Sequence, residues 1–279
     1  MRSLPRPEFD ALDVFRLCNS RIADEDLKSR MLISEKKIRS TDALYQNSAA
    51  EAGLYTHDEA EFQLENVSKT EMIKAYDDRL AHKKGPGRPI YEKIRLSSEI
   101  CPLCNEGVVA ALDHYLPKTK YHALAVNPNN LVPICSDCNT VKKNYVPTHA
   151  ANQALHPYYD RIDDVPWLSA KVVESGAGAA LFEVDPPSNW NEVLAARVKW
   201  HFKQLNLAKL YATKAAAELA SLHYELAQLL RRAGEFEVRA SLRERAEART
   251  KISLNSWQSA MYAALSDCEW YYSGGFLNV

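Results

Sequence analysis

The chain has 279 residues, of which 46% are hydrophobic and 25% charged, so it is long enough for one large domain or two smaller ones. No apolar run approaches the roughly 18 residues of a membrane helix, and charges occupy the stretch where a signal peptide would need an apolar core, so we expect a cytoplasmic protein without membrane segments. The formal net charge is -1, so the charge of the whole chain does not indicate a nucleic-acid partner and the local distribution of charge has to be examined.

Residues 1–82 are predicted to form a helical N-terminal region. Apolar residues recur there at spacings of three and four, as at Leu12 and Phe15 and again at Leu27 and Met31. Such spacing is typical of amphipathic helices that pack around a core.

Residues 83–98 are predicted to be a basic linker followed by a short helix, because the stretch KKGPGRP interrupts the helical pattern. Its Gly-Arg-Pro core is also similar to the arms that some DNA-binding proteins place in the minor groove, which leaves a second interpretation open. From residue 83 to residue 145 there are nine Lys and Arg side chains and five Asp and Glu side chains. This basic segment of a near-neutral chain favours phosphate binding.

Four cysteines form two Cys-x-x-Cys pairs: Cys101, Cys104, Cys135 and Cys138. In a reducing cytosol such pairs bind metal more often than they form disulfides, and two of them can offer four thiolates to one tetrahedral ion. We therefore predict a structural Zn²⁺ site. The other two cysteines, Cys18 and Cys268, lie in helix-like patterns and are expected to be small buried residues.

The residues around the cysteine pairs predict a strand, a loop, a strand and a helix. GVVAALDH is a β-prone run that ends at Asp113 and His114, NLVPIC is a second such run, and SDCNTVKKN begins with a capping Ser and continues as a helix. Adjacent residues of an extended strand point to opposite faces, so the first strand must end or bend at Asp113 and His114 if both side chains serve one phosphate.

Taken together, CPLC, LDHYLP, NLVPICSDCN and VKKN, in this order within about residues 99–146, resemble an HNH endonuclease of the ββα-metal type with a four-cysteine zinc clamp. YHALAV and HPYYD are similar to elements of stand-alone HNH nucleases of bacterial anti-phage defence systems, such as the Septu-type nuclease subunit. The resemblance implies a nuclease unit at residues 99–160 that hydrolyses phosphodiester bonds of DNA, in phage defence or restriction, under the control of a partner.

Four residues are the candidate catalytic set. Asp113 and Asn139 supply the hard oxygen ligands that suit a catalytic Mg²⁺ or Mn²⁺. The resemblance makes His114 the general base, a task that suits imidazole, and makes Asn130 the residue that fixes the loop and orients His114. The third signature residue of the family is often His, and its replacement by Asn139 favours an ion that prefers oxygen.

Lysines near this set are expected to contact phosphate, and one of them, Lys142, matches the usual Lys of the family. They are Lys118, Lys120, Lys142 and Lys143. His156, in the HPYYD stretch, is instead predicted to be structural.

Residues 161–279 are predicted to contain a hairpin, in AKVVESGAGAALFEV, followed by helices from Trp190 onward. The predicted fold is thus mainly α, with a small central ββα-metal unit between helical regions. The C-terminal helices are interpreted as a scaffold bundle, with a recognition module as the alternative.

Several partners and one other function are consistent with the sequence. The expected partners are DNA, an ATPase or sensor protein of the same operon that docks on the helices, and a second copy of the chain, with no membrane. The alternative function is a zinc-stabilised nucleic-acid-binding or interaction subunit without catalysis.

Overall fold

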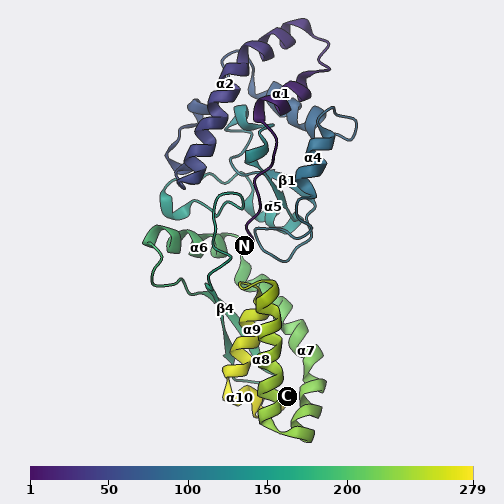
Figure 1. The fold of residues 1–279 in the computed structure, drawn as a ribbon, viewed down its shortest axis with the longest axis vertical. Helices are drawn as coiled ribbons and strands as arrows, with labels where there is room; N and C mark the ends of the chain where they lie inside the picture. The colour runs from purple at the N-terminus through teal and green to yellow at the C-terminus, as the bar shows by residue number, and fades with distance from the viewer. Residues whose placement is uncertain (279) are drawn as a thin grey trace. The chain divides into compact units, whose positions relative to one another are not determined.

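A computed structural model of the protein describes residues 1–278 (Figure 1). The chain divides into two compact units, unit 1 (Met1–Arg161) and unit 2 (Ile162–Val279). The fold is mainly helical with two small antiparallel sheets, which confirms the predicted class at this level. Among the described residues, no helix combines the length and the apolar character needed to cross a membrane.

Unit 1 contains five α-helices, one π-helix and two strands, joined by short 3-10 turns. The α-helices are α1 (Ala11–Asn19), α2 (Glu25–Ala50), α3 (Lys69–Lys74), α4 (Arg88–Arg95) and α5 (Ser136–Lys142). The π-helix η3 (Ala75–Leu80) continues α3, and the strands are β1 (Ala111–His114) and β2 (Leu131–Ile134). The 3-10 turns are η1 (Leu54–Thr56), η2 (Glu59–Phe62), η4 (His122–Leu124), η5 (Pro128–Asn130) and η6 (Ala150–Asn152).

The N-terminal helices and the small sheet share one apolar core. Buried side chains of α1 to α4 pack in a single cluster with Leu112 of β1 and Leu131 of β2. Helix α4, which lies within the predicted linker and short helix at residues 83–98, contributes Tyr91 and Ile94 to this cluster. The sheet is therefore supported by helices that come before it in the sequence.

The Gly-Arg-Pro stretch is folded against unit 1 in this structure. Gly87 donates its N–H to the carbonyl oxygen of Arg79 at 2.9 Å. The guanidinium of Arg88 forms an ion pair with Glu92 and lies 4.7 Å from the centroid of the Tyr91 ring. These contacts make the stretch part of the packed surface rather than an extended arm.

An ion pair joins α2 to the start of α3. Ser68 caps α3 in a capping box with Glu71, and Arg30 of α2 donates two hydrogen bonds to the Glu71 carboxylate at 2.7 and 3.0 Å. The hydrogen bonds from Arg30 lower the pKa of Glu71 from 4.5 to about 2.

Glu71→Gln is expected to lower the free energy of unfolding by about 1–2 kcal/mol at pH 7, a value reduced by the partial exposure of the pair. Because the folded pKa lies below the unfolded one, this stabilisation is complete above pH 4.5 and is lost as the pH falls toward 2. Denaturant unfolding at pH 7 measures the effect. The control is Glu25→Gln, whose exposed pair with Lys28 should contribute at most about 0.5 kcal/mol; an equal loss in both variants would contradict the prediction.

Unit 2 consists of a hairpin followed by helices. The predicted hairpin is present as β3 (Leu168–Val173) and β4 (Ala179–Val184), and its turn places Gly176 and Gly178 at positive φ. The helices are α6 (Glu192–Gln204), α7 (Leu207–Ala233), α8 (Glu235–Ile252), α9 (Trp257–Asp267) and α10 (Glu269–Tyr272), with the 3-10 turn η7 (Gly275–Leu277).

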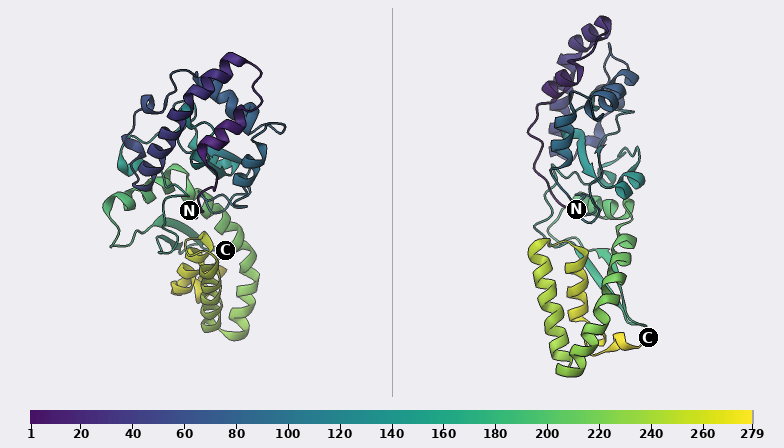
Figure 2. Two further views of the ribbon diagram at one scale, coloured as in Figure 1. Left: turned by 45° about the horizontal axis from the view of Figure 1, so that its top comes forward. Right: turned by 90° about the vertical axis from the view of Figure 1, so that its right-hand side faces the viewer.

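The long helices of unit 2 pack as a bundle on the hairpin. Helix α7 contacts β4, α9 contacts β3, and α8 lies against α9 and α7 (Figure 2). The Phe182 ring of β4 meets the Tyr211 ring of α7 edge-on, with the centroids 5.7 Å apart. Unit 2 is therefore a two-stranded hairpin covered by helices.

Candidate functional site

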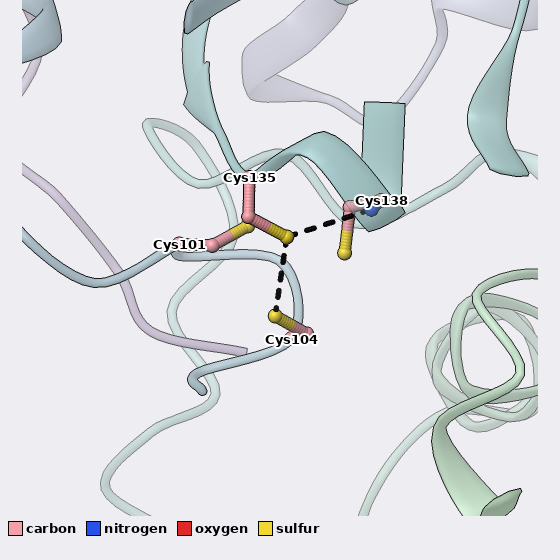
Figure 3. Close-up of side chains that lie close together, drawn as sticks. All are labelled: Cys101, Cys104, Cys135 and Cys138. Carbon is pink, nitrogen blue, oxygen red and sulfur yellow. Dashed lines mark hydrogen bonds between the residues drawn. The ribbon is translucent and has the colours of Figure 1, made fainter. Parts of the chain in front are cut away.

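The four cysteines of the two Cys-x-x-Cys pairs meet in unit 1. Their sulfur atoms all lie within 4.8 Å of one another, and all four side chains are buried (Figure 3). Cys101 and Cys104 come from the turn before β1, whereas Cys135 caps α5 and Cys138 lies in its first turn. Within residues 1–278, no other group of three or more His, Cys, Asp or Glu side chains is gathered closely enough to suit a metal ion.

Backbone geometry directs the thiols toward one point. Cys101 donates its N–H to Gly107 O at 2.7 Å, and Asn105 takes a left-handed φ of 54°, which closes the first turn. The Sγ of Cys104 accepts the N–H of Gly107 at 3.3 Å, and the Sγ of Cys135 accepts the N–H of Cys138 at 3.5 Å. Such N–H donors stabilise thiolates.

The donor set fits zinc. Four soft sulfur ligands at mutual distances of a few ångströms are the ligands of a closed tetrahedral structural site. The backbone N–H groups that point at the Sγ atoms of Cys104 and Cys135 favour the thiolate form that a metal requires. The cluster can therefore hold a metal such as zinc, as predicted.

Gly107→Ala is expected to weaken zinc binding by about 10–100-fold. A Cβ atom at this position would lie 2.8 Å from both the Cβ and the Sγ of Cys135, so the ligand must shift. Competition with a chromogenic chelator measures the affinity. Gly53→Ala is the matched control, because its Cβ would meet nothing closer than 3.6 Å; equal affinities of the two variants would contradict the expectation.

The sheet places Asp113 and His114 at the end of β1. Strand β1 pairs antiparallel with β2 so that Asp113 lies opposite Val132 and His114 opposite Leu131. Helix α5, which carries two of the cysteines in its first turn and N-cap, follows β2 directly in the chain.

The imidazole of His114 has a defined tautomer. Its Nε2 atom lies 2.8 Å from the carbonyl oxygen of Ala125. Because a carbonyl can only accept, Nε2 carries the proton and Nδ1 keeps its lone pair. Burial lowers the pKa of His114 to about 3, an effect that Lys118 and Lys142 reinforce, so the ring is neutral at physiological pH.

Asn130 holds the loop that orients this imidazole. It is fully buried, its Oδ1 accepts the N–H of Leu116 at 2.8 Å, and its Nδ2 donates to Leu116 O at 3.0 Å and Leu124 O at 3.4 Å. Leu124 is the neighbour of Ala125, whose carbonyl accepts from His114. Asn130 thus fixes the backbone that fixes the ring.

Lys142 joins the end of α5 to the end of β1. Its ammonium lies 2.7 Å from Oδ2 of Asp113 and donates to the carbonyl oxygen of His114 at 2.8 Å, and the Lys142 side chain is buried. Asn139 lies three residues earlier on α5, exposed, on the same side of the helix as Lys142. Asp113 and Asn139 therefore belong to the two elements that Lys142 connects.

The other three lysines predicted to contact phosphate differ in their surroundings. Lys118 pairs with Asp77 at 2.5 Å and Lys120 pairs with Glu59 at 2.8 Å. Lys143 is exposed, at a φ of 51° where α5 ends. A phosphate at Lys118 or Lys120 would have to share the ammonium with a carboxylate of the protein.

Three other residues named in the sequence analysis were expected to be structural or buried. His156 is buried, with its Nε2 2.9 Å from the Tyr45 hydroxyl and its ring stacked on Tyr115, as its predicted structural role requires. Cys18 is buried as predicted, and burial raises its pKa to about 12. Cys268 is only half-buried, because it stands at the exposed junction of α9 and α10.

One residue beside His114 was not expected. The Tyr76 ring of η3 meets the His114 ring edge-on with a centroid distance of 4.4 Å. No short-range pattern could have indicated it, because the contact joins distant parts of the chain.

A comparison with known proteins found a similar protein from a bacteriophage. The chain is 28% identical to Protein ea31 of Escherichia phage lambda over 297 aligned residues, which cover 98% of this chain and 100% of ea31. No family model matches the chain, and no solved structure matches it. The likeness to the phage protein therefore extends over both units and is not confined to the cysteine segment.

Proposed function

We propose that the protein is a metal-dependent endonuclease of the HNH type that hydrolyses phosphodiester bonds of DNA. The observation that carries the proposal is the imidazole of His114, oriented by Ala125 and following Asp113 at the end of a strand whose partner strand leads into the four-cysteine cluster. In this proposal the cysteine cluster holds a structural zinc ion and does not take part in the reaction.

His114 is the proposed general base. With Nε2–H held by Ala125, the lone pair of Nδ1 is the ring site that can take a proton from an attacking water. The low pKa keeps this site unprotonated at neutral pH, although it also makes the imidazole a weaker base than free histidine. Asn130 acts through the loop and needs no contact with substrate.

Asp113 and Asn139 are the proposed ligands of the catalytic ion. Their hard oxygens suit Mg²⁺ or Mn²⁺, which would neutralise charge on the phosphate and help the leaving oxygen depart. The ammonium of Lys142 lies against Oδ2 of Asp113, so Oδ1 is the oxygen that remains for an ion while Lys142 stays in place.

DNA as the substrate rests on the HNH resemblance and on the charge of the segment. Residues 83–145 carry a net excess of basic side chains, and Lys83, Lys84 and Lys143 among them are exposed. The test offers supercoiled plasmid and a structured RNA to the full-length protein with Mn²⁺. Nicked plasmid beside intact RNA is the expected result, and cleavage of RNA alone would overturn the choice of substrate.

A further inference from the structure

The imidazole of His114 is bounded by a tyrosine from the N-terminal helices. The Tyr76 ring meets it at an interplanar angle of 64° with the centroids 4.4 Å apart. The Tyr76 hydroxyl donates to the carbonyl oxygen of Leu112 at 3.2 Å, in the same strand as His114. One side chain therefore contacts both the imidazole and the strand that carries it.

Tyr76 itself is held from several sides. It belongs to η3, where its carbonyl oxygen accepts the N–H of Ala81, five residues later, at 2.8 Å. Such π-turns are frequent at functional sites. The Lys118 ammonium lies 4.0 Å from the centroid of the Tyr76 ring and pairs with Asp77 at 2.5 Å.

A ring held by one hydrogen bond is not fully oriented. The bond to Ala125 fixes the place of Nε2, but rotation of the imidazole about that bond would still change the direction of the Nδ1 lone pair. The edge contact with Tyr76 fixes the plane of the ring. The two contacts together define where Nδ1 points.

We propose that Tyr76 is a positioning residue of the nuclease site, acting through His114. This inference rests on the proposed role of His114 as the base. It extends the catalytic apparatus beyond the predicted nuclease unit at residues 99–160 to the helix that ends at Leu80. The N-terminal helices are then part of the active site and not a separable domain.

Tyr91 provides a matched control. Its hydroxyl accepts the N–H of Leu112 at 3.3 Å, so it anchors the same residue of β1 as Tyr76 does, and the two tyrosines are buried to the same degree, at 7% and 8% exposure. Among the described residues, the aromatic ring that contacts Tyr91 is that of Tyr76 and not that of His114. Its loss should therefore weaken the strand without releasing the imidazole.

The test measures two properties of the full-length, zinc-loaded protein. The first is the rate of plasmid nicking, resolved into kcat and KM. The second is the NMR signal of the hydrogen-bonded Nε2–H of His114, assigned by its loss in His114→Gln. Tyr76→Leu should lower kcat by about 100-fold with KM within about twofold, and should shift or broaden the signal. Tyr76→Phe keeps the ring, so it should retain kcat within about threefold and an unshifted signal.

Each outcome decides the inference. Tyr91→Leu should keep kcat within about threefold. An unshifted His114 signal and normal kcat in Tyr76→Leu would overturn the inference, as would equal losses in Tyr91→Leu. If Tyr76→Leu does not retain zinc, Tyr76→Phe still decides, because a fall of about 100-fold in that variant would show that the ring contact is not what matters. If no protein nicks DNA but the signal shifts only in Tyr76→Leu, the positioning holds and the proposed function fails.

Discussion

Removal of zinc is expected to unfold unit 1. The four sulfurs lie within 4.8 Å of one another, and they join the turn before β1 to the start of α5. Without a shared metal ion, nothing bridges the four buried thiols, and these two segments are no longer held together. Structural zinc in small domains contributes on the order of 10 kcal/mol of folding free energy. The free energy lost when zinc is removed should therefore exceed the stability of the unit.

The measurement combines metal analysis with limited proteolysis. The wild-type protein should contain one zinc ion, in keeping with its single four-cysteine group, and Cys135→Ser should lose it together with protease resistance of residues 1–161. Cys268→Ser is the control, because that thiol lies far along the sequence in unit 2 and is not a member of the group. A metal-free protein that resists proteolysis as well as the zinc-loaded form would contradict this expectation.

His114→Gln is expected to abolish most cleavage while preserving the fold. The Gln amide can still donate a hydrogen bond to Ala125, but it has no basic lone pair to replace Nδ1. Loss of a general base lowers rates by about 10²–10⁴-fold, so the single-turnover rate should fall by that factor with zinc content unchanged.

The same substitution at a second histidine separates chemistry from packing. His122 is exposed to the same 6% as His114, and its Nε2 accepts the N–H of Leu64 at 2.9 Å, which a Gln oxygen can also do. His122→Gln should therefore keep its cleavage rate within about threefold, because it removes no catalytic group. Similar rates for the two variants would show that His114 is not the base.

The sequence allowed prediction of those parts of the site that depend on local spacing. Two Cys-x-x-Cys turns can bring two thiols each to one ion whatever the rest of the chain does, and the structure gathers all four. Asn130 was likewise assigned to the loop, and its amide does bond to the backbone at both Leu116 and Leu124. The mainly helical class followed from apolar spacing.

Contacts between distant segments could not be predicted. The carboxylates that pair with Lys118 and Lys120 are Asp77 and Glu59, which the sequence separates widely from the lysines. The contact between Tyr76 of η3 and His114 likewise joins segments that are far apart in the sequence. The packing of α4 under the sheet depends on the tertiary core in the same way.

The most direct test of the proposed function is plasmid nicking by the zinc-loaded, full-length protein as Mg²⁺ or Mn²⁺ is added and then removed by buffer exchange, with the zinc content measured at each step. We predict nicking that begins with the divalent ion, stops when that ion is removed while the structural zinc is still bound, and is absent in His114→Gln. Nicking that persists without added Mg²⁺ or Mn²⁺ or in His114→Gln would contradict the proposal, as would intact plasmid at protein concentrations equal to those of the DNA.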